Sequence, residues 1–250
     1  MNETTGRTSD TAKRALVTGG SGGIGAAICR ELSAAGHFVY VHAHRGRAAA
    51  DAVAAEITAA GGEAGVVCFD VTDAAATRSA LDTLLQQAPV QILVNNAGIH
   101  DDAAFPGMSP QQWHSVIDVA ISGFYNVTQP LMMPMIRARW GRIINISSVA
   151  ALVGNRGQVN YAAAKGALNA ATKALSLEVA SRGITVNAVA PGIISTDMSS
   201  PAFDAAMIAN LVPMKRAGTA LEVASLVRYL ASNDAGYITG QVISISGGLS

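Results

Sequence analysis

The segment RALVTGGSGGIGAAICRELSAAG, residues 14–36, leads from a strand-like run through a glycine-rich turn into a helical run. The run RALVTG (14–19) is short and mostly apolar, which is typical of a buried strand. The run GGIGAAICRELSAAG (22–36) repeats apolar residues at helical spacing and ends at Gly36, a common helix stop. The segment therefore predicts a βα unit with glycine at the junction, an arrangement that lets backbone approach a phosphate.

The same alternation continues along the chain. Further strand-like runs cover residues 37–43, 63–71, 90–98, 141–148, 183–192 and 240–248. Helical patterns cover residues 47–62, 73–88, 109–138, 158–181 and 219–231. Strict alternation favours right-handed crossovers and a parallel sheet that helices cover on both faces. We expect an α/β fold over residues 13–250, a single doubly wound Rossmann-type domain of about seven parallel strands, which binds ligands at their carboxyl ends.

Composition excludes several classes of protein. Half of the 250 residues are hydrophobic and 14% are charged, which is ample for a buried core. The net charge is zero, and no apolar run reaches the roughly 18 residues of a membrane span, so we expect neither a nucleic-acid nor a membrane partner. MNETTGRTSDTAK at the start lacks the apolar region of a secretory signal, so we expect a cytoplasmic protein with a flexible tail at residues 1–12. Cys29 and Cys68 are then expected to be buried, reduced thiols.

The turn TGGSGGIG (18–25) is the first candidate ligand site. Gly19, Gly23 and Gly25 lie at relative positions 1, 5 and 7, and the helix that follows offers free N–H groups and a positive dipole end to a pyrophosphate. An ordinary glycine-rich βα turn is the alternative interpretation. The candidate cofactor-binding residues of this turn are Gly19, Gly20, Ser21, Gly22, Gly23, Ile24 and Gly25.

The second strand-like run ends at HAHRGR (42–47), which bears on the choice of cofactor. It has no acidic residue for a ribose 2′-hydroxyl, but Arg45 and Arg47 could bind a 2′-phosphate through charge-assisted hydrogen bonds. The segment favours NADPH/NADP+ over NAD, and a solvated basic loop is the alternative.

The next two strand ends add candidate cofactor contacts. Asp70 and Val71 are expected to flank an adenine ring. The motif NNAG (95–98) would lie beside the cofactor, although asparagines also serve in turns by bonding their own backbone. The candidate residues of this motif are Asn96, Ala97 and Gly98.

A serine, a tyrosine and a lysine form the candidate catalytic group. Ser148 ends the fifth strand-like run, and Tyr161 and Lys165 follow 13 and 17 residues later in a helical run. A spacing of four places the last two on one helix face. We expect the lysine ammonium to lower the pKa of the tyrosine, and the serine hydroxyl to hydrogen-bond a carbonyl as it becomes an alkoxide. The alternative is a surface pair, because Y-x-x-x-K alone is common by chance.

In this order, the motifs TGGSGGIG, NNAG, the serine of SSVAA, YAAAK and the APG of residues 190–192 resemble the classical short-chain dehydrogenase/reductase family over residues 13–248. Within it the chain is most similar to the 3-oxoacyl-acyl-carrier-protein reductases, through GRIINISS, GNRGQVNYAAAKGAL, ASRGITVNAVAPG and ITGQVISISGG. The resemblance implies that NADPH delivers hydride to a 3-oxoacyl thioester. Tyr161 would donate the proton, Ser148 orient the carbonyl and Lys165 hold the nicotinamide ribose, with no metal. Further implied nicotinamide contacts are Pro191, Gly192, Ile194 and Thr196.

One residue departs from the family pattern. The family usually has an asparagine seven residues beyond Trp113, where it supports a local helix distortion and a water in a proton relay; this chain has Ala120. Two interpretations stay open: a slower but working reductase, with the water on a backbone carbonyl, or a catalytically impaired NADP-binding protein.

The resemblance also implies partners. Residues 195–216 would form a lid, whose apolar residues could line an acyl chain or simply pack in the core. Arg139 and Arg182 match basic positions that receive the acidic acyl carrier protein, the alternative being exposed arginines before a turn. The family implies a homotetramer with dimer faces on the helices at 109–138 and 158–181. A CoA thioester or another alcohol, sugar or steroid stays open as the substrate.

Overall fold

The computed structural model describes residues 12–195 and 204–250. Within these residues, seven parallel strands form the main sheet in the order β3-β2-β1-β4-β5-β6-β9. The strands are β1 (Arg14–Val17), β2 (Phe38–Ala43), β3 (Ala64–Cys68), β4 (Ile92–Asn95), β5 (Gly141–Ile146), β6 (Ile184–Pro191) and β9 (Val242–Ile245). The order reverses between β1 and β4, and such a switch point opens a crevice at the carboxyl ends of the strands. The expected doubly wound α/β fold is confirmed.

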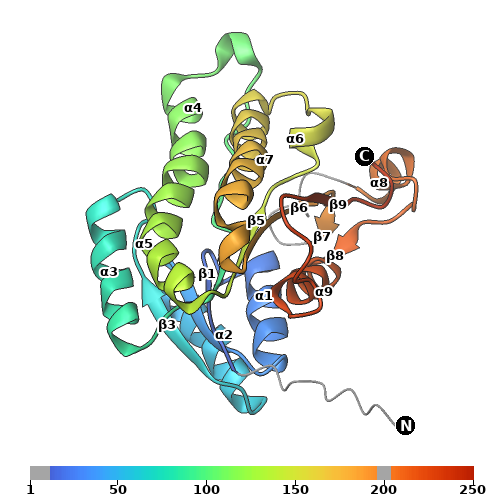
Figure 1. The fold of residues 1–250 in the computed structure, drawn as a ribbon. Coiled ribbons are helices and arrows are strands. Elements are labelled where there is room, and N and C mark those ends of the chain that lie inside the picture. The colour runs from blue at the N-terminus through green and yellow to red at the C-terminus, as the bar shows by residue number, and fades with distance from the viewer. Residues whose placement is uncertain (1–11, 196–203) are drawn as a thin grey trace.

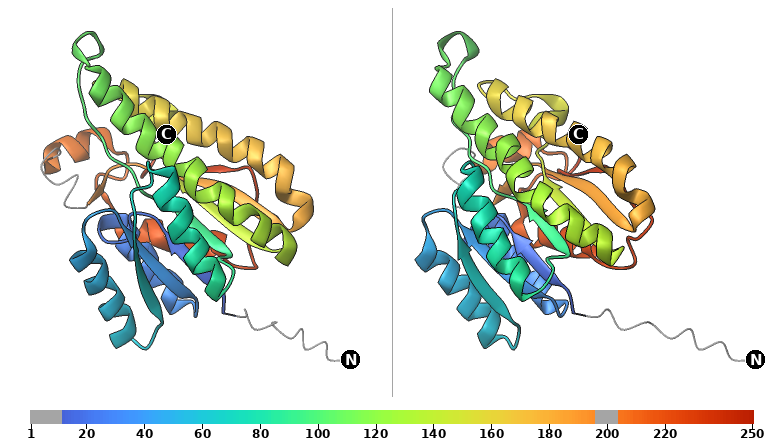
Figure 2. Two further views of the ribbon diagram at one scale, coloured as in Figure 1. Left: turned by 90° about the vertical axis from the view of Figure 1, so that its left-hand side faces the viewer. Right: turned by 60° about the vertical axis from the view of Figure 1, so that its left-hand side comes forward.

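Helices cover both faces of this sheet (Figure 1). One face carries α1 (Gly23–Ala34), α2 (Arg47–Ala59) and α9 (Ala220–Ala231). The other carries α3 (Ala74–Gln87), α5 (Gly123–Ala138) and α7 (Val159–Val179), which lie side by side in Figure 2. α4 (Pro110–Ile117) continues beyond the sheet and packs against α7.

The alternation of side chains in β1 explains why the sheet has two cores. Ala15 and Val17 pack with α1 and α9, whereas Leu16 packs with side chains of α3 and α5 on the opposite face. All three are fully buried. Because successive side chains of a strand point to opposite faces, a strand covered on both sides needs an uninterrupted apolar run. This is the pattern that made the strands visible in the sequence.

The helix expected over residues 109–138 is divided by a distortion. A capping box between Ser109 and Gln112 starts α4, and a π-helical turn at Asp118–Ser122 separates it from α5. The other expected strands and helices are present and end up to three residues earlier or later. Short elements that the sequence did not reveal are η1 (Phe105–Gly107), α6 (Ala150–Val153), η3 (Ala180–Arg182), β7 (Ile194–Ser195), α8 (Ala205–Leu211) and β8 (Gly218–Thr219).

The two cysteines differ in environment. Cys29 is buried in α1, as expected. The expectation for Cys68 was wrong, because it is exposed at the end of β3, and β3 is the edge strand of the sheet. Among the described residues, no helix has both the length and the apolarity that crossing a bilayer requires.

Candidate active site

The glycine turn between β1 and α1 has the geometry of a phosphate cradle. Gly19 adopts a left-handed φ of 62°, and a Cβ at Gly25 would collide with the Gly19 carbonyl, so the turn and the helix start pack backbone to backbone. Gly22 caps α1 without any side-chain hydrogen bond, and a Cβ there would meet open space. The N–H groups of the first helical turn therefore face a side of the turn that a pyrophosphate fits.

Asn96 holds this turn from the neighbouring strand β4. Its side-chain amide donates to the carbonyls of Thr18 at 2.9 Å and Gly19 at 3.0 Å. The Thr18 hydroxyl accepts in return from the backbone N–H groups of Asn96 and Ala97 at 2.9 and 3.0 Å. The Asn96 amide therefore bonds the backbone of the glycine turn and not its own backbone, which was the alternative considered from the sequence. It shapes the candidate cofactor cleft through that turn.

The segments after β2 and β3 bring charged side chains together. His44 lies 3.4 Å from Asp70, and Arg45 is exposed beside them. Hydrogen bonds from the backbone N–H and hydroxyl of Thr72 lower the pKa of Asp70, and the charges of His44 and Arg45 add to this. Arg47 pairs with Asp51 at 3.4 Å within α2. Arg45 is therefore the better placed of the two candidate arginines for a 2′-phosphate.

Ser148, Tyr161 and Lys165 meet at the carboxyl edge of the sheet. Ser148 follows β5, and its hydroxyl interacts with the partly buried Tyr161 near the start of α7. One turn further, Lys165 is 3% exposed and its Nζ lies 5.7 Å from the centre of the Tyr161 ring. A Cβ at Gly98 would come within 3.2 Å of that Nζ, so the NNAG motif touches the lysine. The candidate catalytic group therefore adjoins the candidate cofactor cleft.

The electrostatics differ in one respect from expectation. Burial raises the pKa of Tyr161, the Ser148 hydroxyl opposes the rise, and the charge of Asp102 adds to it. Burial also lowers the pKa of Lys165 to about 8. The expected lowering of the tyrosine pKa by lysine is wrong, because desolvation of the phenolate dominates. Tyr161 is held as a neutral phenol, which is the form that can donate a proton.

Asn160 fixes the start of α7 and was missed in the sequence. It is fully buried, and its amide N donates to the carbonyls of Asp101 and Gln112, both at 2.9 Å. Its amide O accepts from the backbone N–H of Tyr161 at 2.8 Å. The loop after NNAG, α4 and α7 are thus joined at the residue before the tyrosine. The asparagine of NYAAAK was the available signal.

The Asp102 carboxylate, whose charge acts on Tyr161, belongs to a surface network. It lies 3.3 Å from His100 and accepts from the Gln158 amide at 2.9 Å. Gln158 accepts in turn from Asn155 at 2.8 Å. Since Asp102 and His100 are each nearly half exposed, this network lies where the candidate site opens to solvent.

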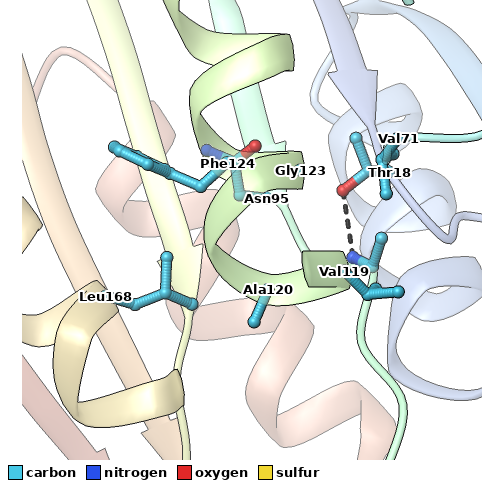
Figure 3. Close-up of a pocket in the computed structure, with 9 residues that line it drawn as sticks. Thr18, Val71, Asn95, Val119, Ala120, Gly123, Phe124 and Leu168 are labelled. Atoms are coloured by element: carbon cyan, nitrogen blue, oxygen red, sulfur yellow. Dashed lines mark hydrogen bonds between the residues drawn. The ribbon is translucent and has the colours of Figure 1, made fainter. Parts of the chain in front are cut away.

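Ala120 lies in the π-helical turn and borders a small cavity (Figure 3). Its methyl group packs with Val116 and Ala164. The cavity measures about 10 Å³, the size of one water molecule. Its lining residues are Thr18, Val71, Asn95, Ala97, Val119, Ala120, Gly123, Phe124 and Leu168. The helix distortion therefore persists with alanine in place of asparagine.

The segment after β6 closes the site on the side of the serine. The Pro191 carbonyl accepts from the backbone N–H of Val149 at 2.8 Å, and a Cβ at Gly192 would come within 2.8 Å of Ser246 Cα. Ile194 packs its side chain in the core, so a cofactor contact there would come from its backbone. Thr196, the remaining candidate, lies outside the described residues.

Comparisons with known proteins give the family. A sequence model of the short chain dehydrogenases matches residues 13–206. The chain is 44% identical to a 3-oxoacyl-[acyl-carrier-protein] reductase of Synechocystis sp., which covers 96% of this chain and 97% of the relative. It is 43% identical to nodulation protein G of Rhizobium sp., over 96% of this chain and 97% of the relative.

The chain belongs to the short-chain dehydrogenase family. Its structure is similar to the crystal structure of a putative gluconate dehydrogenase from Agrobacterium tumefaciens, with a TM-score of 0.92, 30% identity and 95% of each chain covered. This short-chain dehydrogenase is accordingly a nicotinamide-dependent oxidoreductase acting on CH–OH groups. Among the described residues, no group of three or more histidine, cysteine, aspartate or glutamate side chains could hold a metal ion.

The two predicted docking residues of this short-chain dehydrogenase lie at the amino ends of the strands, opposite the carboxyl ends that hold the candidate site. Arg139 and Arg182 each stand two residues before a strand, β5 and β6 respectively. They are neighbours, because the Arg139 guanidinium donates to the Ser181 carbonyl at 3.2 Å. Ser148 lies beyond the other end of β5, about 20 Å away for a six-residue strand. Arg139 and Arg182 therefore do not border the candidate site of their own chain.

The expected lid of this short-chain dehydrogenase is described only in part. Residues 196–203 of the expected lid lie outside the described residues. In α8 and the loop after it, Met207, Leu211 and Met214 are exposed by 45%, 50% and 63%. Apolar groups that reach solvent beside the strand ends suit a covering for an apolar substrate.

Proposed function

We propose that this short-chain dehydrogenase reduces a 3-oxoacyl thioester to the 3-hydroxyacyl thioester with NADPH. The observation that carries the proposal is the meeting of Ser148, Tyr161 and Lys165 beside an uncapped glycine turn. The substrate class rests on similarity to relatives named 3-oxoacyl-[acyl-carrier-protein] reductase along nearly their whole length. Fatty-acid synthesis, or related polyketide or aryl-polyene synthesis, is the setting we propose.

The side chains of the site have separate tasks in the proposed reduction. Bound NADPH supplies the hydride. The neutral phenol of Tyr161 donates a proton to the carbonyl oxygen, and the Ser148 hydroxyl orients that oxygen and stabilises its developing charge. Lys165 binds the nicotinamide ribose, and its positive charge favours the phenolate left after proton transfer. Asn160 keeps the tyrosine at the mouth of the site.

NADPH is the proposed cofactor because of the residues after β2. Arg45 is exposed at the end of the strand, close to the Asp70 and Val71 segment proposed for the adenine. Arg47 pairs with Asp51 inside α2, whereas Arg45 precedes that helix, and a guanidinium can bind a 2′-phosphate with two parallel hydrogen bonds. We expect tighter binding of NADPH than of NADH, and Arg45→Ala should remove most of that difference.

The persistence of the π-helical turn at Asp118–Ser122 supports a working enzyme over a protein that only binds the cofactor. π-Helical turns often occur at functional sites, because they expose backbone groups that a regular helix would use. In the proposed enzyme, a freed carbonyl near Ala120 takes over the support of the proton relay.

An oligomer would explain how Arg139 and Arg182 could guide a carrier. α5 and α7 run from the active-site edge of the sheet to the edge with the arginines, and Tyr125, Met133 and Leu177 expose apolar surface on them. A two-fold axis across this face would pack α5 against its copy in the opposite direction. Since α5 is about 24 Å long, the arginines of one subunit would then approach the active-site end of the other. We propose a homotetramer with one such interface; a cytoplasmic location stays a prediction of the sequence.

The test is a panel of carrier-linked and CoA-linked 3-oxoacyl substrates of varied chain length, with NADPH and NADH. We expect NADPH oxidation on at least one thioester, and Tyr161→Phe should lower turnover about 10²- to 10⁴-fold while NADPH still binds. Turnover only on simple alcohols or sugars would replace the substrate class. NADPH binding without turnover on any carbonyl would leave a cofactor-binding protein.

A further inference from the structure

His42 lies beneath the cofactor cleft and has no role in the reaction described above. It is the fifth residue of β2 and is 2% exposed. Its Nδ1 accepts from the backbone N–H of Gly19 at 3.1 Å, and its Nε2 lies 3.0 Å from the Phe69 carbonyl. Because Nδ1 accepts a hydrogen bond, the proton of the neutral ring must be on Nε2, which then donates to Phe69.

The bond to Gly19 fixes one side of the peptide that begins the glycine turn. Gly19 has a left-handed φ of 62°, and its carbonyl accepts from the Asn96 amide at 3.0 Å. Its N–H is held by His42 from β2, so the strands on both sides of β1 clamp this one residue. The clamp sets the direction in which the rest of the glycine turn leaves β1.

The bond to Phe69 connects His42 to the segment after β3, where the adenine is proposed to bind. Phe69 precedes Asp70 and Val71, the segment proposed to flank the adenine. The imidazole also packs on the Phe69 ring, with 4.1 Å between ring centres. One side chain therefore joins the loop for the pyrophosphate to the loop for the adenine through backbone groups of both.

We propose that His42 is a positioning residue for the dinucleotide, which holds the glycine turn and the end of β3 at the separation that the cofactor requires. The proposal rests on the proposed cofactor site and is independent of the acyl substrate. His42 is neutral when it does so, because protonation of Nδ1 would remove the acceptor for Gly19. Burial lowers its pKa to about 4, which keeps it neutral in the working range.

Two amide variants separate the two hydrogen bonds. The amide oxygen of asparagine is bonded to Cγ, as Nδ1 is in histidine, so His42→Asn can keep the acceptor for Gly19 but loses the donor to Phe69. The amide nitrogen of glutamine lies one bond further out, near the position of Nε2, so His42→Gln can keep the donor to Phe69 but loses the acceptor for Gly19. His42→Leu loses both.

The measurement is the Kd of NADPH and of NADH from cofactor fluorescence, with no acyl substrate present. Because the bridge needs both hydrogen bonds, we expect His42→Asn and His42→Gln each to bind NADPH and NADH about tenfold or more weakly than the wild type, and His42→Leu at least as weakly. With saturating cofactor, kcat should change less than the KM for NADPH.

A control separates positioning from general stability. Met135→Ala empties part of the core beside Gly141, at the end of β5 opposite the cleft, and should lower the unfolding temperature without changing the NADPH Kd. An NADPH Kd close to that of the wild type in His42→Asn or in His42→Gln would overturn the proposal, because the bridge needs both hydrogen bonds. A wild-type protein that binds neither dinucleotide would instead remove the proposed function.

Discussion

The ammonium of Lys165 donates to the carbonyl of Ile146 at 2.7 Å and so ties α7 to the last residue of β5. Ser148 follows two residues later, so the lysine is anchored to the strand that carries the serine. Burial lowers the pKa of Lys165 to about 8, because the charged form loses hydration in the interior. The positive charge beside Tyr161 therefore depends on pH close to neutrality.

We predict that kcat/KM falls as the pH rises through about 8, where Lys165 loses its proton in the free enzyme. Lys165→Arg keeps the charge throughout this range but changes the shape of the donor, so the variant should be slower and should lack this alkaline decline. Rates between about pH 6 and about pH 10 measure the effect. The same alkaline limb in the arginine variant would assign the titration to another group.

Asn160→Ala should lower both stability and turnover. The substitution leaves the Asp101 and Gln112 carbonyls and the Tyr161 N–H without their shared partner. Each of these groups that water does not reach lowers the free energy of unfolding by about 1–3 kcal/mol. Urea unfolding and kcat measure the two effects, and the NADPH Kd should stay within about threefold. Asn155→Ala, which removes an exposed amide near the same loop, is the matched control and should be close to wild type. A stable, fully active Asn160→Ala protein would contradict this structural role of Asn160.

Ala120→Asn tests whether the missing asparagine amide limits turnover through the proposed proton relay. The cavity of about 10 Å³ is smaller than the added group, so we expect a loss of about 1–3 kcal/mol in stability together with faster turnover. Ala120→Leu adds a side chain of similar shape without hydrogen-bonding atoms, and should lose stability without gaining rate. If turnover of the asparagine variant equals that of the wild type at every pH, the relay is not limited at this position.

Charge reversal at the far edge of the sheet tests carrier docking. Arg139→Glu with Arg182→Glu should raise the KM for a carrier-linked substrate at least about tenfold and leave the KM for acetoacetyl-CoA within about twofold, because only the carrier would meet the patch. Arg78→Glu, an exposed arginine on α3, is the control. Similar losses on both substrates would remove the docking assignment.

Stability should depend on His42 below neutral pH. Its pKa is about 4 in the folded protein against 6.5 for the free side chain, so the unfolded chain binds the proton first. This group therefore destabilises the fold progressively from pH 6.5 down to about 4, by roughly 3 kcal/mol in total, and has no effect above that range. The His42→Asn protein should show a shallower loss of unfolding free energy between these pH values. Equal slopes would mean that other groups control acid stability.

The sequence was sufficient for the sheet and for the grouping of the candidate residues at the carboxyl ends of its strands. Apolar runs such as 141–148 and 183–192 identify strands that are buried on both faces, and the glycine pattern of 18–25 identifies the turn. The spacing from Ser148 to Tyr161 and Lys165 predicts a shared site only because the carboxyl ends of parallel strands lie together. Local pattern and topology agree at these positions, so each supports the other.

Long-range hydrogen bonds were beyond reach of the sequence. His42 and Asn160 act through backbone groups of segments 27 and 59 residues away, and no local pattern indicates such partners. The position of Arg139 and Arg182 far from Ser148 follows from the direction of β5 and β6. The match of the two arginines to the family pattern did not reveal this distance. The pKa of Tyr161 depends on how much water its phenol loses, which only the packed structure determines.

The π-helical turn at Asp118–Ser122 also sets the rotation of α5 about its own axis. Each residue of an α-helix advances the side chains by about 100°, and the wider π-turn takes up one extra residue without that advance. Val127, Leu131 and Met135 of α5 face the core because the extra residue is taken up in this way. Deleting a single residue between 118 and 122 would therefore straighten the helix and leave that apolar row facing the core. The distortion beside Ala120 thus also keeps the register of a core helix.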